Sequence, residues 1–233
     1  MWSDLISCIE SDADIKDKLS FLNTLINVHG INLEGEKEIK QIKTKIKELC
    51  SDATKRTEGL LLLYAVVHCS STLYVDNWSQ IVLGSLKIPD SIISREIPVR
   101  VVNRMLMNFG HDSDYSDVFS KVVPEILPIL LDPKDDKIYK LSCQSLAACM
   151  RCVPEIAGTR VADIENLLLK ELRNPYGEIV EAIGECFAAL PVCVLHLQRK
   201  DGPVEYKEIW CNIFTKILNT MNSMFNSILR LTE

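Results

Sequence analysis

The sequence lacks an apolar stretch long enough to cross a membrane. Even the run Gly59–Val67 is closed by His68 and preceded by charged residues, whereas a transmembrane helix needs about 20 consecutive apolar residues. The first fourteen residues contain neither a basic region nor a clean apolar segment, so they do not resemble a secretory signal. These absences predict an intracellular protein without a membrane partner.

Signatures of catalysis are also missing. The sequence contains no glycine-rich phosphate loop, no Gly-x-Ser-x-Gly elbow and no His-Glu-x-x-His zinc motif. Its four histidines are isolated from one another: His29, His68, His111 and His196. We therefore predict that the chain is not an enzyme and that it needs no cofactor.

Basic residues are fewer than acidic residues in this sequence. The chain has 26 Lys and Arg against 32 Asp and Glu, for a net charge of −6, which argues against the basic footprint of a nucleic-acid-binding protein. The segment Glu36–Leu49 is an exception, with lysines at Lys37, Lys40, Lys43, Lys45 and Lys47. This segment is interpreted as an amphipathic helix with a solvated lysine face. The alternative is a weak phosphate contact, which no interleaved aromatic residue would assist.

The nine cysteines form no recognisable metal or disulfide framework. Their number is odd, and they occupy apolar positions of helical patterns. Cys149 and Cys152 form a Cys-x-x-Cys pair, but no second pair follows at a zinc-like distance and no strand precedes it. The pattern predicts reduced thiols that pack in the core, and no metal site.

Four amphipathic segments are present at a regular spacing of roughly 40 residues. They begin near Thr54, Glu96, Asp136 and Pro175. Self-similarity at this period is typical of HEAT and armadillo repeats, in which helix pairs bury their apolar faces by stacking on their neighbours. Strand alternation and hairpin turns are missing. The sequence therefore predicts an all-α fold, a HEAT/armadillo-like α-solenoid of antiparallel helix pairs closed by a long C-terminal helix.

We predict one domain over residues 1–233. It would contain N-terminal helices within 1–50, about four helix pairs over 54–190 and a long terminal helix within 203–233. The expected first helix begins at Asp14, and the fourth repeat helix ends at Pro191. Two prolines inside Asp117–Leu131 predict that this helix is kinked or split into two short pieces.

The last expected helix, Tyr206–Leu231, has a nearly continuous apolar seam about seven turns long. The seam consists of Ile209, Ile213, Ile217, Met221, Met224, Ile228 and Leu231. It can pack along the last repeats or form a dimer, and the sequence does not separate the two. Five of these residues are candidate protein-binding residues: Ile213, Ile217, Met221, Met224 and Ile228.

A second candidate protein-binding motif has the form Leu-x-x-Leu-Leu. Leu127, Leu130 and Leu131 share one helix face and could enter the groove of a partner. The competing interpretation is that these leucines form the inner layer of the solenoid, because Pro128 would deform a short docking helix.

Three segments together resemble one known family. They are Ser145–Pro191, with its ACM…P…G turn and its EC…LP helix end, Arg56–Leu63 (RTEGLLLL), and Val123–Leu131 (VPEILPILL). They resemble the N-terminal domain of the proline-, glutamic acid- and leucine-rich protein, the metazoan counterpart of the fungal Rix-type ribosome-assembly factor. The resemblance extends from about residue 54 to the end, where Glu205–Leu229 matches the long closing helix in character.

The resemblance implies a scaffold subunit of the rixosome, a nucleolar and nucleoplasmic assembly that matures the large ribosomal subunit. Its role would be to support removal of the second internal transcribed spacer from pre-rRNA. The implied partners are a WD-repeat propeller subunit, a second helical-repeat subunit, the endonuclease and polynucleotide-kinase module, the AAA ATPase midasin and pre-60S particles. Self-association as a homodimer is also implied.

This sequence departs from the family in one respect. The family's acidic, proline-rich tail and most of its leucine motifs are not found in these 233 residues. Either the sequence is a piece of a longer protein, or the interactions of that tail do not apply. An alternative function, from a different class, is a general helical-repeat adaptor in transport or chromatin regulation.

Overall fold

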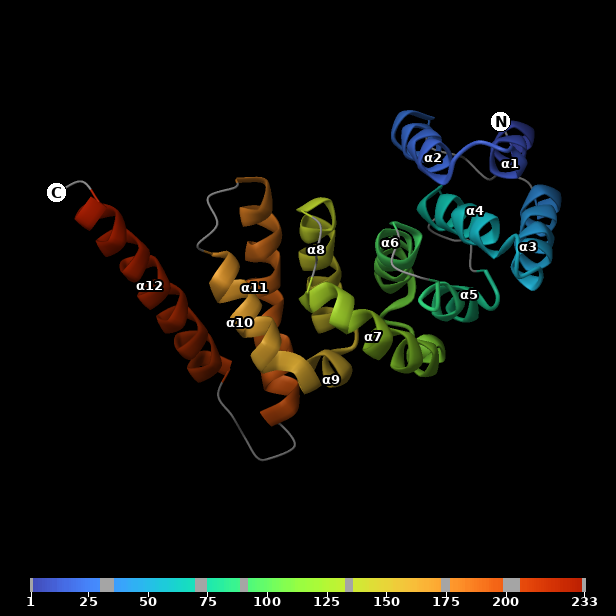
Figure 1. Cartoon of the computed structure of the whole chain (residues 1–233). Helices are drawn as coiled ribbons and strands as arrows, with labels where there is room; N and C mark the ends of the chain where they lie inside the picture. The colour runs from blue at the N-terminus through green and yellow to red at the C-terminus, as the bar shows by residue number, and fades with distance from the viewer. Residues whose placement is uncertain are drawn as a thin grey trace. The chain divides into compact units, whose positions relative to one another are not determined.

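Helices account for all the regular secondary structure in the part of the chain that the computed structural model describes (Figure 1). That part comprises residues 2–29, 36–69, 75–88, 92–132, 136–172, 177–198 and 206–231. The prediction of an all-α fold is therefore confirmed. The chain divides into two compact units, Met1–Asn108 and Phe109–Glu233. The predicted extent of a single domain stays a prediction.

The first unit is built around α4. Its helices are α1 (Trp2–Glu10), α2 (Ile15–His29), α3 (Glu36–Ser51), α4 (Arg56–Cys69), α5 (Trp78–Ser85) and α6 (Ile92–Phe109). Helix α4 packs against α1, α2, α3 and α5, and every residue from Leu60 to Val67 is buried. A helix that is apolar on all sides requires such cover, because exposing any of its faces to water is costly.

A close approach of α3 to α4 depends on Gly59. A Cβ atom at this position would lie 2.3 Å from the Sγ of Cys50 and 3.1 Å from its backbone nitrogen. Both distances are shorter than a van der Waals contact, so only glycine lets the two helices meet at this distance. Burial raises the pKa of the Cys50 thiol to about 11, and this thiol is therefore protonated at neutral pH.

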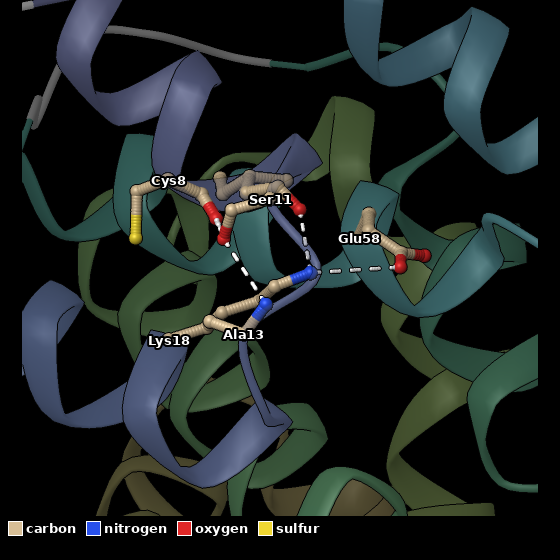
Figure 2. A network of polar contacts seen from close by, with 6 residues as sticks. Cys8, Ser11, Ala13, Lys18 and Glu58 are labelled. Carbon is tan, nitrogen blue, oxygen red and sulfur yellow. Dashed lines mark hydrogen bonds and ion pairs between the residues drawn. The ribbon is translucent and has the colours of Figure 1, made fainter.

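A buried lysine attaches α1 and α2 to α4. The Nζ atom of Lys18 donates a hydrogen bond to the carbonyl of Ile9 at 2.8 Å and lies 3.8 Å from Oε1 of Glu58 (Figure 2). The Lys18 side chain is 5% exposed and that of Glu58 25%. Because the Ile9 carbonyl belongs to the last turn of α1, it lacks an intrahelical partner, and the ammonium supplies one. The glutamate in turn compensates the buried positive charge.

The second unit contains the remaining helices. They are η1 (Ser113–Tyr115), α7 (Ser116–Leu131), α8 (Asp136–Cys152), α9 (Pro154–Ala157), η2 (Gly158–Arg160), α10 (Val161–Glu171), α11 (Gly177–Gln198) and α12 (Tyr206–Leu231). The core of this unit lies where α8 meets α11, and α7, α9 and α10 pack around this pair. Figure 1 shows α8 and α11 side by side.

Two thiol hydrogen bonds fix the register of α8 against α11. Cys186 Sγ donates to the Cys143 carbonyl at 2.7 Å, and Cys193 Sγ lies 3.6 Å from the Met150 carbonyl, each across 43 residues of sequence. Equal offsets at two points mean that the helices run parallel. Burial and a neighbouring thiol or carboxylate raise the pKa of Cys186 and of Cys193. Both are therefore neutral donors, which agrees with the prediction of packed, reduced thiols.

The structure differs from the predicted helices in three places. Helix α11 continues through Pro191 to Gln198, because buried Leu190 and Cys193 hold the last turns against α8 and offset the lost backbone hydrogen bond. Of the two alternatives predicted for α7, a kink or a split, the split is wrong, because the helix runs unbroken from Ser116 to Leu131 with six buried side chains along its length. An unexpected helix, α1, precedes Asp14.

Candidate functional site

The long last helix is only partly covered by the rest of its unit. Its bounds, Tyr206–Leu231, are those predicted from the sequence. Ile209 and Ile213 are 3% and 5% exposed, on a helix that packs against α10 and α11. Lys216 Nζ contacts both carboxylate oxygens of Glu165 on α10, at 2.7 and 2.8 Å. These contacts attach the N-terminal half of α12 to the unit.

Beyond these contacts α12 diverges from its neighbours. Figure 1 shows its C-terminal end leaning away from α10 and α11. Among the described side chains from Leu218 onward, none is buried. Three large apolar side chains are exposed here: Phe214 at 57%, Leu218 at 44% and Met221 at 52%. Their spacing of four and three residues places them on one face of the helix, and we call this face the α12 stripe.

The structure separates the predicted seam residues into two groups. Ile213 is buried and Ile217 half-buried, so these two serve the attachment of α12 to its unit. Met221 belongs to the exposed α12 stripe. The side chains of Met224 and Ile228 lie outside the described residues.

Sequence reasoning missed Phe214 and Leu218. The signal was present as the doublets Ile213-Phe214 and Ile217-Leu218. Adjacent residues on a helix point about 100° apart, so two successive doublets widen the apolar surface beyond what one neighbour covers.

The leucine motif of α7 lies mostly in the core. Leu127 is 2% exposed and Leu130 is fully buried, which is the arrangement of the core-packing interpretation. Leu131 is half-buried and lines a surface hollow of about 520 Å³ between α7 and α10, together with Pro128, Arg160 and Asn166. Docking of the motif into a partner would require α7 to expose its buried face.

The lysine helix, α3, has part of its charge neutralised within the first unit. Lys45 Nζ lies 2.5 Å from Glu10 of α1, and Lys47 Nζ lies 3.2 Å from Asp76. The pKa of Lys45 is raised, chiefly by its hydrogen bond to Glu10. These ion pairs reduce the number of cations left for a phosphate backbone, so the geometry favours the solvated-face interpretation.

The titratable groups do not assemble into a recognisable catalytic cluster. No group of three or more His, Cys, Asp or Glu side chains among the described residues could hold a metal ion. His68 is half-buried, and desolvation together with Arg100 and Arg104 lowers its pKa to about 4. His196 lies 3.9 Å from Glu155 at the surface. Cys149 is buried and Cys152 half-buried on α8.

One segment corrects the expectation about membrane-spanning length. Ile179–His196 of α11 is long and apolar enough to cross a bilayer, and 44% of it is buried inside the protein. Its buried side chains pack in the core of the second unit, where α11 meets α8. A core helix of this kind meets the same criterion of length and composition, so the segment is weak evidence for a membrane span.

Comparison of the chain with protein-family models, with curated proteins and with solved structures gives no match in any of the three.

Proposed function

We propose that this chain is a non-catalytic scaffold, a helical-repeat array of the HEAT/armadillo kind that works by binding other proteins. The exposed α12 stripe is the observation on which the proposal rests. Single exposed apolar residues are normal on a protein surface, but three neighbours on one helix face form a contiguous patch of the kind that binds proteins.

The repeat architecture is supported by the way its equivalent helices pack. In a repeat array the first helices of successive pairs run parallel, with an offset equal to the repeat length. The two thiol contacts between α8 and α11 both have an offset of 43 residues. In the first unit, Arg104 Nε of α6 donates to the Val67 carbonyl of α4 at 3.3 Å, across 37 residues. Both offsets are close to the spacing of roughly 40 residues in the sequence.

The occupant of the α12 stripe that we propose is a second copy of this chain. The segment from Ile217 to Leu229 contains no Asp, Glu, Lys or Arg. A two-fold interface places identical patches face to face. A charged side chain near the centre of the patch would therefore lie close to the same charge on the second copy. An uncharged apolar stripe avoids this repulsion and is therefore suited to self-association.

The biological setting that we propose is the rixosome. The support is the resemblance of Arg56–Leu63, Val123–Leu131 and Ser145–Pro191 to the Rix-type family. In this setting the chain holds the WD-repeat propeller subunit, a second helical-repeat subunit, the nuclease and kinase module and midasin on pre-60S particles. It would act in the nucleolus and nucleoplasm, in support of spacer removal from pre-rRNA.

Self-association is tested by the mass of the chain in solution, measured by light scattering during size-exclusion chromatography. The wild type is expected to have the mass of two chains and Phe214→Glu that of one, because the carboxylate would be desolvated in the interface. Asn219→Glu is the control, since it adds the same charge to an exposed position of α12 outside the stripe. A wild-type mass of one chain at micromolar concentration would contradict the proposed occupant.

The setting is tested by purification of the tagged chain from cells. We expect a WD-repeat subunit and pre-60S particles to co-purify, and the chain to be enriched in nucleoli. A cytoplasmic or vesicular distribution, without these partners, would instead support the general adaptor.

A further inference from the structure

We propose that the first unit contains a binding site for an acidic peptide segment of a partner protein, centred on Arg56. The site is a hollow of about 590 Å³ where the end of α3, the start of α4 and helix α5 meet. This site belongs to the first unit and the α12 stripe to the second, and the inference does not depend on the rixosome assignment.

Cations dominate the charge of this hollow. Lys47, Arg56 and Lys87 line it, against one carboxylate, Asp76. Lys47 lies 3.2 Å from Asp76, and these two side chains are about half exposed. Arg56 and Lys87 therefore remain as two uncompensated positive charges. In a chain of net charge −6, this is a local reversal of sign that attracts an anion.

Arg56 is unusual because no acceptor in the described part of the chain satisfies its guanidinium. The other arginines whose side chains are described all have polar or charged partners: Arg95, Arg100, Arg104, Arg151 and Arg160. Arg56 is half-buried and makes no hydrogen bond or ion pair with the residues that the structure describes. A guanidinium has five N–H donors in a planar fork that matches a carboxylate, so a partly desolvated fork without an acceptor indicates a missing anion.

The neighbours of Arg56 keep its fork open to the hollow. Helix α5 has Gly84 beside the arginine, and a Cβ atom there would lie 3.6 Å from its Cδ and 3.8 Å from its Nη1. The arginine stem therefore lies along α5 at a point where α5 has no side chain. Glu58, two residues further along α4, is directed to Lys18 instead. The nearest acidic residue of α4 is thus not available to Arg56.

Two helix N-termini in the hollow favour negative charge, and the C-terminal end of α3 opposes it. Arg56 is the first residue of α4, and Asn77 precedes the first residue of α5. Helix N-termini carry partial positive charge and unsatisfied N–H groups. Asn77 has a left-handed backbone (φ 62°) and makes no side-chain cap to α5.

The rest of the lining is suited to a peptide more than to a nucleic acid. Asn77 and Gln80 present exposed amides that can pair with a peptide backbone, and Ile81 and Leu83 add apolar surface. Among the described lining residues there is no aromatic side chain on which a base could stack. These features favour carboxylates presented on a peptide.

The test uses a fluorescein-labelled peptide of twelve residues with alternating Glu, Asp and Gly, and its Gln/Asn counterpart. Fluorescence anisotropy with the full chain at about 0.15 M ionic strength keeps non-specific attraction low. We expect the acidic peptide to bind and the neutral peptide to bind at least about tenfold more weakly. An inability to bind the acidic peptide, or tighter binding of a twelve-nucleotide single-stranded RNA, would overturn the proposal.

Four variants locate the site. Arg56→Gln should weaken binding of the acidic peptide about tenfold or more, and Arg56→Lys, which keeps the charge but loses the fork, should weaken it by less. Lys55→Gln is the matched control, because it removes the same charge from the adjacent, exposed position outside the hollow. Equal losses in Arg56→Gln and Lys55→Gln would contradict a specific site. Phe214→Glu should bind the peptide as the wild type does, which separates this test from that of self-association.

Discussion

Helices α4 and α12 contain similar proportions of apolar residues but have opposite surroundings. Helix α4 packs against four other helices of its unit, and its residues from Leu60 to Val67 are all buried. Helix α12 packs against α10 and α11 over its first half, and its stripe of Phe214, Leu218 and Met221 is exposed. The same kind of side chain therefore stabilises the fold in one helix and is available to a partner in the other.

The difference follows from how the apolar residues are distributed around each helix. In α4 they cover every face, so the helix is stable only when it is enclosed. In α12 they form one broad face, and the remaining surface is rich in Asn, Ser and Thr. A helix of this kind can remain folded when neighbouring helices cover only part of its surface. Exposed apolar area, and not apolar content, therefore distinguishes α12 from α4.

The largest effect is expected from the same substitution made in both helices. Leu62→Ala in α4 should lower the free energy of unfolding by about 2–5 kcal/mol, because it leaves a cavity at a fully buried position. Leu218→Ala in α12 should change it by less than about 0.5 kcal/mol when measured on the monomer. Urea denaturation of both variants measures these values. Similar losses for the two would show that α12 is covered within one chain.

Much of this contrast could be predicted from the sequence, and part of it could not. The bounds of α12 were predicted because its apolar period is strong and unbroken over many turns. The exposure of Phe214 was not, since burial depends on where α10 and α11 end relative to α12. Likewise, the continuation of α11 past Pro191 depends on contacts with α8, which override the local preference of proline. Tertiary contacts, which no local pattern encodes, decided these last two features.

The second effect concerns His68 at the end of α4. Its pKa in the folded protein is about 4, below the value of about 6.5 in an unfolded chain. As the pH falls, the unfolded chain therefore binds the proton first. Stability is complete above about pH 6.5 and decreases toward pH 4, by about 3 kcal/mol from this group.

The control for this effect is His68→Phe, which cannot titrate. The difference in free energy of unfolding between wild type and variant should shift in favour of the variant between pH 7 and pH 4.5. A difference that does not change with pH would mean that the α4 end is open to solvent, and the contrast with α12 would then weaken.

The third effect concerns the lysine that attaches α1 and α2 to α4. Lys18→Met should cost about 1–3 kcal/mol, because it leaves the Ile9 carbonyl without its donor and Glu58 without its counter-charge. Lys45→Met removes a more exposed ion pair with Glu10 and should cost less than about 1 kcal/mol. Thermal unfolding of the two variants compares them. Equal losses of stability in the two variants would indicate that the packing of α1 and α2 on α4 does not depend on this buried contact.

The candidate sites illustrate the same limit of sequence reasoning. The leucine motif of α7 satisfies a docking pattern, yet Leu127 and Leu130 are buried. Arg56 belongs to the segment Arg56–Leu63, which resembles the Rix-type family. No pattern in the sequence shows that its guanidinium lacks an acceptor. That observation needs the positions of Gly84, Glu58 and Asp76 in space.

The account depends most directly on whether the exposed face of α12 is covered by a second chain in solution. Hydrogen–deuterium exchange, measured at low and high protein concentration, tests this. Peptides from residues 218–229 should become more protected as the concentration rises, while those from residues 60–67 should be strongly protected at both concentrations. Exchange in residues 218–229 that is independent of concentration would contradict the account.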